Sequence, residues 1–218
     1  TYSASRRDTP PPAGVPTRQE FKELDSSALS PRLALLWHAT PSTDVRASAY
    51  SGFRVPTLNE LYRVFRVRND VTAANERLVP ERLIGGEIGL QQRWGPFTGR
   101  VTGFWNEVEN LVANVTLSSR LPDCPTGTTC RQRQNLERGR IRGIETELEL
   151  QPSRHWRLSA SHLYTEAEVV ATRRAQRALQ GKRLAQVPEN AYTLGARYDH
   201  PAVFRLSLLG RFVGGQFE

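Results

Sequence analysis

The 218-residue sequence contains no methionine, only two cysteines and no long run of hydrophobic residues. The longest apolar run is LALLW, whereas a helix that crosses a bilayer needs ~20 apolar residues, so no such helix is expected. The lack of methionine predicts an internal fragment of a longer protein, or a chain whose start has been removed by processing. No signal peptide is recognisable. The mean hydropathy of −0.51 is typical of a soluble protein, but the alternating strands of a membrane barrel average to similar values.

The two cysteines, Cys124 and Cys130, lie in the segment LPDCPTGTTCRQ, where proline, glycine and threonine indicate a loop. This arrangement favours a short disulfide hairpin formed in an oxidising compartment, and two free thiols are the alternative. A metal site needs more ligands than these, and no histidine lies nearby. We therefore expect no metal site at the cysteines.

Motifs of enzymes are also missing. The sequence has no P-loop, no GxGxxG and no serine-centred nucleophile elbow. The histidines are scattered, without partners at metal-ligand spacing; they are His38, His155, His162 and His200. We expect neither an enzymatic activity nor a bound metal or cofactor.

Acidic residues are fewer than basic ones, 22 against 30, so the formal net charge is +8. Of the 30 basic residues, 28 are arginines. Arginine binds carboxylates and phosphates through two parallel hydrogen bonds. The excess positive charge therefore fits an anionic small ligand, lipid A phosphates or nucleic acid, or simply a solvated surface.

The clearest pattern lies in Arg138–Pro152, RGRIRGIETELELQP. A strand turns successive side chains to opposite faces. One face then carries Ile144, Thr146, Leu148 and Leu150, and the other carries Glu145, Glu147 and Glu149. Three ionised carboxylates cannot lie in a dry core without partners. The segment is either part of a half-exposed soluble sheet or a membrane-barrel strand with lipid outside and a wet lumen inside.

In the barrel interpretation the three glutamates face the lumen, and we expect them to pair with arginines rather than to bind an ion. The candidate arginines lie on neighbouring predicted strands: Arg32, Arg46, Arg157, Arg197, Arg205 and Arg211.

Eight strands of roughly ten residues are predicted, which is the length that strands tilted by ~45° need to cross a bilayer. Their ranges are Ser30–Ala39, Asp44–Phe53, Arg82–Gln92, Phe97–Glu107, Arg138–Gln151, Trp156–Ala167, Ala191–Asp199 and Phe204–Gly214. A strand extension is possible at Leu111–Leu117, and a helix is possible within residues 170–182.

Short turns and long segments alternate between these strands, and aromatic residues gather beside the short turns. Both features are typical of an antiparallel up-and-down transmembrane β-barrel, whose aromatic girdle lies at the bilayer interface. The aromatic residues are Trp37, Trp94, Phe97, Trp156, Tyr198 and Phe204. The short turns, with Pro152, are then expected at the periplasmic rim and the long loops outside.

Three motifs resemble one protein family in order and spacing, between Ser30 and Phe217. The first long loop carries a Gly-Phe-Arg-x-Pro-Thr-Leu-x-Glu-Leu-Tyr motif and an Asn-x-x-Leu-x-Pro-Glu stretch: Gly52, Phe53, Arg54, Pro56, Thr57, Leu58, Glu60, Leu61, Tyr62, then Asn75, Leu78, Pro80 and Glu81. Further matches are Asn135, Ile141, Gly143, Glu145 and Glu147, then Gly181, Leu184, Val187 and Pro188. These residues resemble the TonB-dependent outer-membrane receptors.

The resemblance implies a barrel of about 22 strands plugged by an N-terminal domain. Residues 1–218 are then expected to be a partial barrel domain, with the plug, the TonB box and the final strands outside it. The implied function is import of a scarce ligand, such as a ferric siderophore or cobalamin, across the outer membrane of a Gram-negative bacterium. Energy is expected from the TonB–ExbB–ExbD complex acting through the plug. The alternatives are a non-transporting barrel, as an adhesin or passive pore, and a soluble basic β-domain.

The first long loop is where ligand contacts are expected. In the family, the corner corresponding to Gly52–Tyr62 is largely structural, because glycine permits a bend and Pro56 ends the strand ladder. We therefore place ligand contacts after it, in Arg63–Asn75, where arginines and an aromatic residue suit an anionic chelate: Arg63, Phe65, Arg66, Arg68 and Asn69. The second basic loop, Glu168–Glu189, is expected to be a solvated surface.

Overall fold

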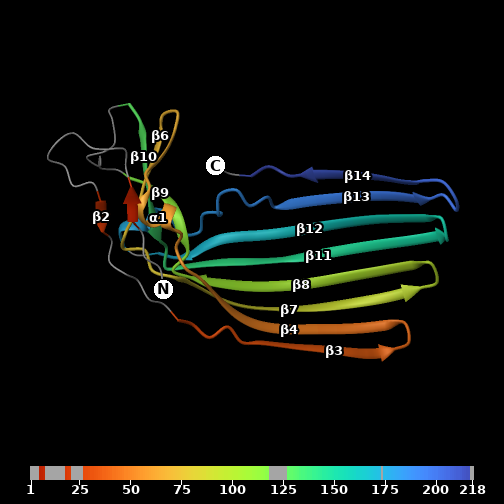
Figure 1. The fold of residues 1–218 in the computed structure, drawn as a ribbon. Helices are drawn as coiled ribbons and strands as arrows, with labels where there is room; N and C mark the ends of the chain where they lie inside the picture. The colour runs from red at the N-terminus through yellow and green to blue at the C-terminus, as the bar shows by residue number, and fades with distance from the viewer. Residues whose placement is uncertain (1–4, 8–17, 21–26, 118–126, 173, 217–218) are drawn as a thin grey trace.

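The structure, a computed structural model, describes residues 5–7, 18–20, 27–117, 127–172 and 174–216. Figure 1 shows eight long strands side by side in one open sheet, with tight turns at one end and a smaller sheet and a helix gathered at the other. The strand order is β14-β13-β12-β11-β8-β7-β4-β3. Each long strand pairs antiparallel with the next long strand of the chain. The predicted antiparallel up-and-down arrangement is confirmed.

The eight predicted strands are all present in this main sheet. They are β3 (Arg32–Thr40), β4 (Thr43–Arg54), β7 (Glu81–Trp94), β8 (Phe97–Glu109), β11 (Arg138–Ser153), β12 (Trp156–Ala171), β13 (Asn190–Asp199) and β14 (Arg205–Val213). Several extend beyond the predicted range at the end of the long connections. In β12 the apolar alternation stops at Tyr164, where Glu166 and Glu168 follow on the same face, but the backbone ladder with β11 continues. Alternation therefore marks only part of each strand.

Gly52 lies within the regular ladder of β4, opposite Leu83, and the strand continues to Arg54. The bend expected at Gly52 stays a prediction. No heavy atom lies within 4 Å of a Cβ built at Gly52, and its φ is not in the left-handed region. Neither close packing nor backbone conformation therefore requires glycine at this position.

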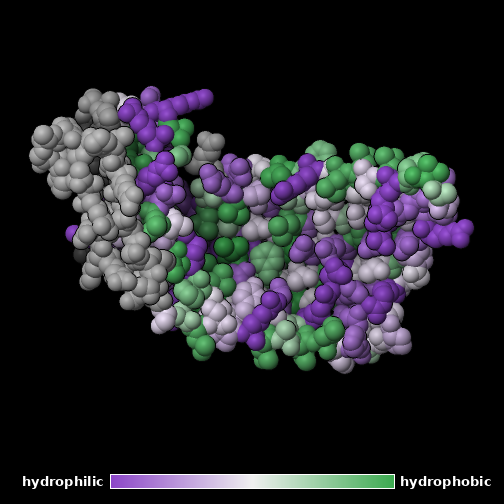
Figure 2. All heavy atoms as spheres, in the orientation of Figure 1, coloured by the Kyte–Doolittle hydropathy of each residue, from purple (hydrophilic) through white to green (hydrophobic). Residues whose placement is uncertain are grey.

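The main sheet has one polar and one apolar face. In register, Glu147 lies opposite Arg100 and Ser161, whereas Leu148 lies opposite Gly99 and Ala160. We call the side with Glu147 the polar face and the side with Leu148 the apolar face. In the view of Figure 2, hydrophilic side chains spread across the middle of the sheet and hydrophobic ones gather along its margins.

The apolar face is widely exposed within the described chain: the relative exposure is 51% at Ile144 and 63% at Ile88. An exposed apolar surface of this extent needs a non-aqueous cover. A barrel wall with lipid on this side provides that cover, as the alternation of residues predicts.

A second, four-stranded sheet lies at the end of the long connections. Its order is β5 (Phe65–Val67), β6 (Asp70–Ala73), β10 (Thr129–Asn135) and β9 (Val112–Thr116), with β6 and β10 parallel. We call it the small sheet. Beside it are α1 (Leu58–Tyr62) and a 3₁₀ helix, η1 (Arg174–Leu179). The remaining described pair is β1 (Ser5–Arg7) with β2 (Arg18–Glu20).

These loop elements differ from the predictions. Leu111–Leu117 was expected to extend the preceding strand, but the chain turns at Asn110, whose φ is +55°, and enters the small sheet as β9. Within residues 170–182, η1 replaces the possible helix, because residues up to Ala171 still belong to β12.

The hydrophobic core lies at this end of the molecule rather than within the main sheet. Leu61 and Leu136 are 1% and 2% exposed, and Leu136 clusters with Val115 and Val169. The long connections are therefore packed structures held together by their own core. In the part of the chain that the structure describes, no helix reaches the length and apolar character needed to cross a bilayer.

Candidate functional site

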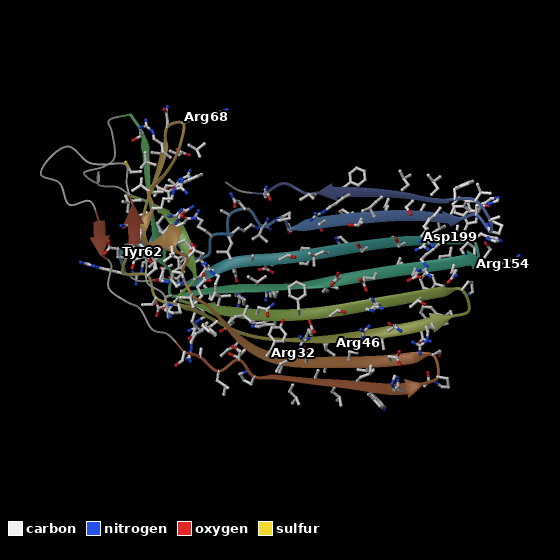
Figure 3. The ribbon with its side chains drawn as sticks, in the orientation of Figure 1. Arg32, Arg46, Tyr62, Arg68, Arg154 and Asp199 are labelled. Atoms are coloured by element: carbon white, nitrogen blue, oxygen red, sulfur yellow. The ribbon has the colours of Figure 1, made fainter. Side chains whose placement is uncertain are left out.

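The hairpin formed by β5 and β6 presents basic and apolar side chains to solvent. Phe65 and Val67 are each 52% exposed, and the arginines beside them, Arg66 and Arg68, are also exposed. Because β5 is an edge strand of the small sheet, one side of this hairpin has no neighbouring strand among the described residues. Figure 3 shows Arg68 at the hairpin tip, at the end of the molecule opposite Arg154 and Asp199.

The structure brings the five predicted ligand residues together. Arg63 directly precedes β5, Phe65 and Arg66 belong to it, and Arg68 and Asn69 form the turn. All five are exposed.

The backbone of this turn is fixed by hydrogen bonds. Arg68 has a φ of +52°, and its carbonyl accepts a hydrogen bond from Nε of Arg66 at 3.2 Å. The carbonyl of Asn69 accepts one from the amide of Thr129 in β10 at 2.8 Å. The guanidinium groups of Arg63 and Arg68 have no polar partner among the described residues, so a ligand could use their donors.

Local charge at the hairpin is positive. The nearest acidic residue along the chain, Asp70, forms an ion pair with Arg131, with 3.6 Å between Oδ2 and Nη2. Guanidinium groups bind anionic oxygens through directed hydrogen bonds and also stack on aromatic rings. Phe65 adds an exposed aromatic surface. The arrangement suits a ligand that is both anionic and aromatic or apolar.

The Gly-Phe-Arg-x-Pro corner before the hairpin holds α1 in place. Thr57 is the N-cap residue, and a reciprocal capping box joins it to Glu60. Arg54 donates to the Glu60 carboxylate at 2.9 Å and to the carboxylate of Glu81 at the start of β7. Burial tends to raise the pKa of Glu60. Hydrogen bonds from Arg54 and from the amide and hydroxyl of Thr57 outweigh this, so that the pKa lies below its ordinary value of 4.5.

Two asparagines that belong to the family motifs connect the first long loop to the second through hydrogen bonds. Asn135 binds both the amide and the carbonyl of Val79, at 2.9 and 3.0 Å, and donates to the carbonyl of Asn110 at 2.6 Å. Asn75 donates to the carbonyl of Arg133 at 2.8 Å. Glu81 accepts from the amide of Val112 at 2.6 Å. We call Asn75, Glu81 and Asn135 the clamp beneath the hairpin. Their side chains hydrogen-bond to the backbone of the other loop segments and so hold the loops together.

Arg133 adds to this clamp in a way that the sequence did not reveal. Its Nη1 donates to the carbonyls of Asn59 and Arg63, at 2.7 and 3.1 Å, and so satisfies the end of α1. The two segments are 70 or more positions apart in the sequence, and no local pattern links them.

The polar face of the main sheet contains the predicted glutamates. Glu147 pairs with Arg100, which also donates to Gln91 at 2.8 Å. Glu149 pairs with Arg157 at 3.0 Å. Glu145 makes no ion pair within the described chain. Of the two arginines, Arg157 was among the candidates and Arg100 was not, although it occupies the alternating polar position directly opposite Glu147.

The second basic loop is tied down by an ion pair. Arg183 donates to Glu189 at 2.8 Å, and this hydrogen bond holds the pKa of the Glu189 carboxyl below its ordinary value. The isolated bridge between Glu168 and Arg183 joins the loop to the end of β12. The loop is therefore fixed against the barrel end, and its charges are partly neutralised.

Cys130 is disulfide-bonded, and Cys124 lies outside the described residues. Among the residues that the structure describes, no group of three or more histidine, cysteine or acidic side chains could hold a metal ion.

Comparison with known proteins identifies the family. The family model described as "TonB dependent receptor-like, beta-barrel" matches residues 1–218. The chain is 26% identical over 177 residues to the iron-regulated outer membrane virulence protein of Vibrio cholerae serotype O1, a match that covers 76% of this chain and 26% of the relative. The chain thus spans about a quarter of the length of the curated relatives it matches.

Solved structures share the fold. A ferric enterobactin receptor variant, PfeA of Pseudomonas aeruginosa, matches with a TM-score of 0.62 and 17% identity, over 86% of this chain and 28% of that chain. The copper transporter OprC matches with a TM-score of 0.62 and 19% identity, over 84% and 26%. The siderophore receptor PirA of P. aeruginosa matches with a TM-score of 0.60 and 18% identity, over 86% and 34%. The chain therefore belongs to the family of TonB-dependent receptor β-barrels and is a protein of the outer membrane of a Gram-negative bacterium.

Proposed function

We propose that this chain is the wall and outer loops of a transporter that captures an anionic iron chelate outside the cell and imports it. The observation that carries the proposal is the basic, aromatic hairpin Arg63–Asn69, held out on the side of the long loops. Its exposed guanidinium groups and ring suit the carboxylate, catecholate or hydroxamate oxygens of a ferric siderophore. The names of the V. cholerae relative and of PfeA and PirA, which refer to iron or siderophores, favour iron chelates over cobalamin.

The proposal includes an orientation. The polar face, with Glu145, Glu147 and Glu149, lines the lumen, and the apolar face meets lipid. The short turns, with Pro152, face the periplasm, and the small sheet lies outside. An ionic lumen wall suits contact with a polar plug domain encoded outside residues 1–218, through which the TonB–ExbB–ExbD complex would supply energy.

Uptake by cells tests the transport itself. A strain lacking the gene should lose uptake of at least one ⁵⁵Fe-labelled chelate from a panel of catecholate, hydroxamate and carboxylate siderophores. Cobalamin serves as a parallel substrate. Unchanged uptake across this panel and of cobalamin would exclude transport of these ligands and favour an adhesin or a passive pore.

Variants of the hairpin test the site. In the full-length receptor, the triple change Arg63→Ser, Arg66→Ser and Arg68→Ser should weaken binding of the transported chelate by roughly tenfold or more, since charge-assisted hydrogen bonds are the strong ones. Arg154→Ser, an exposed arginine at the opposite end, is the matched control. Equal chelate affinity in the triple variant and the control would remove the hairpin from the binding site without affecting the proposal of transport.

A further inference from the structure

A polar pair of side chains lies within the apolar face of the main sheet. On this face β12 carries, from the short turn towards the long loops, Trp156, Leu158, Ala160, His162, Tyr164 and Glu166. His162 therefore lies between an aromatic residue at the short turn and the first charged residue, about 13 Å along the strand from Glu166. At a strand tilt of ~45° this position is about 9 Å below the charged level, within the hydrocarbon layer.

His162 interacts with two side chains of the neighbouring strand β13. Its Nε2 lies 2.9 Å from Oδ1 of Asn190, within hydrogen-bonding distance. The imidazole ring stacks on the ring of Tyr192, its register partner, with 4.4 Å between the centroids and 10° between the planes. We call His162, Asn190 and Tyr192 the polar patch. All three side chains are at least partly exposed on the apolar face.

The hydrogen bond between His162 and Asn190 leaves one donor and one acceptor unused. A neutral imidazole has one N–H donor and one bare nitrogen, which is an acceptor. If Nε2 donates to Oδ1 of Asn190, then Nδ1 of His162 remains as an acceptor and Nδ2 of Asn190 remains as a donor. With the Asn190 amide in the opposite orientation the two free groups exchange roles, so one of each kind is left in either case. Neither group has a further polar partner among the described residues.

Lipid tails cannot satisfy these two groups. Hydrocarbon offers no hydrogen bonds, so a free donor and a free acceptor at this depth carry the cost of unpaired polar groups. A polar side chain inside the membrane therefore indicates a partner that pairs with it. Here the partner must supply one donor and one acceptor side by side. A second copy of this chain presents that combination.

We propose that two copies of the receptor associate side by side through the polar patch, around a two-fold axis along the bilayer normal. In such a contact His162 of each copy binds Asn190 of the other. The two side chains lie at nearly the same depth, because their bonded atoms are 2.9 Å apart. Rotation about the normal preserves depth, so the free donor of each copy reaches the level of the free acceptor of the other. The proposal rests on the orientation in the proposed function, in which the apolar face meets lipid.

The surroundings of the polar patch suit a contact between proteins. Phe212 of β14 is the register partner of Tyr192, and Tyr164 of β12 is that of Asn190. Both rings are exposed on the same face. Apolar side chains alone do not drive association in a membrane, because lipid tails are equally apolar. The hydrogen bonds of the patch therefore select the partner, and the aromatic rings add packing area.

Single-molecule photobleaching of the fluorophore-labelled, full-length receptor in bilayers counts the copies in each complex. The unaltered receptor should form dimers, in a fraction that rises with its density. His162→Leu and Asn190→Leu should each weaken dimerisation by roughly tenfold, because each leaves the group that it paired with unsatisfied in hydrocarbon. Ile88→Leu, an apolar change at an exposed position of the same face on β7, is the control and should leave dimerisation unchanged.

A mixture of the two leucine variants separates a contact between copies from a role within one copy. A mixed pair keeps one hydrogen bond between His162 of one copy and Asn190 of the other, and it places the two leucines opposite each other. A pair of identical variants keeps no such bond. Two-colour photobleaching should therefore find mixed pairs in excess of the half that random pairing gives. If His162 and Asn190 acted only within one copy, pairing would be random.

The outcomes also separate this proposal from the transport proposal. A receptor that is monomeric at every density, dimerisation unchanged in both leucine variants, or random pairing in the mixture overturns the dimer contact. A monomer that retains a hydroxylated lipid in a His162-dependent manner also overturns it. These results leave transport untouched, because the variants alter neither the basic hairpin nor the lumen. A receptor that dimerises as described but fails every uptake test overturns the transport proposal alone.

Discussion

The carboxylate of Glu60 accepts a hydrogen bond from the backbone amide of Thr57 at 2.7 Å, and the Thr57 hydroxyl accepts one from the amide of Glu60 at 3.3 Å. This reciprocal pair matters because α1 has only five residues and could not be stable alone. The helix buries Leu61 almost completely and ends at Arg63, immediately before the basic hairpin. The capping box therefore fixes the point from which the hairpin starts.

Removing the N-cap side chain should loosen this helix. We expect Thr57→Ala to cost about 1 kcal/mol in the local stability of α1, which corresponds to roughly fivefold faster exchange of its amides. Hydrogen–deuterium exchange of Glu60 and Leu61 in the full-length receptor in detergent measures the change. Thr116→Ala, at an exposed position of β9, is the matched control. Equal exchange in both variants would show that packing of Leu61 alone holds the helix.

The same carboxyl should make the loop sensitive to acid. The pKa of Glu60 is lowered in the folded protein, so its stabilising contribution is complete above its ordinary value of 4.5 and is lost as the pH falls through the folded value. Protection of the α1 amides should therefore be constant from pH 7 to about 5 and decline below 4.5. In Glu60→Gln the protection should be weaker at pH 7 and should lack this decline. A decline of equal size in both proteins would assign it to other carboxyls.

The clamp beneath the hairpin provides a stronger test. Asn135→Ala removes three hydrogen bonds, two to Val79 and one to Asn110. At about 1 kcal/mol for each net hydrogen bond, the local stability of the small sheet should fall by about 2–3 kcal/mol. Limited proteolysis of the full-length receptor should then cut the loop of residues 75–81 more readily. Asn114→Ala, an exposed asparagine of β9, is the control, and equal cleavage of the two variants would show that Asn135 is not required.

The residues themselves explain how much of this structure the sequence could predict. The eight strands were found because one face of each is apolar, so alternation as in Ile144–Leu150 shows the strand backbone and also which face is apolar. The end of β12 beyond Ala167 was missed because the apolar face changes sides: Glu166 and Glu168 follow Tyr164 on one face, whereas Ala167 and Val169 are buried on the other. The small sheet was missed because β6 pairs with β10, with Asp70 in register with Thr129, 59 positions further along the chain. Such pairing between distant segments leaves no periodic signal.

The residues of the candidate site also fall into those that the sequence could predict and those that it could not. The exposed arginines of the hairpin were predictable, because a run of charged residues in a loop is solvated wherever the loop lies. The contacts that position them were not. Arginine is usually a surface residue, so the sequence suggests no supporting role for Arg133. Its role depends on the carbonyls of Asn59 and Arg63, which only the folded chain brings near it. The positions that present a ligand site are therefore easier to find than those that support it.

Neighbouring residues on β11 give a direct test of how the sheet faces the membrane. Glu147 and Leu148 point to opposite faces, with Ser161 and Ala160 as their register partners on β12. Nitroxide labels at Leu148→Cys and Ala160→Cys should lie in lipid and relax strongly with oxygen, which concentrates in hydrocarbon. Labels at Glu147→Cys and Ser161→Cys should instead relax with a water-soluble nickel chelate. Power-saturation spectra of the full-length receptor in bilayers measure both accessibilities, and label pairs on one strand serve as each other's control. If the labels at Glu147 and Ser161 proved to be the lipid-exposed ones, the polar face could not line the lumen, and the proposed orientation would be wrong.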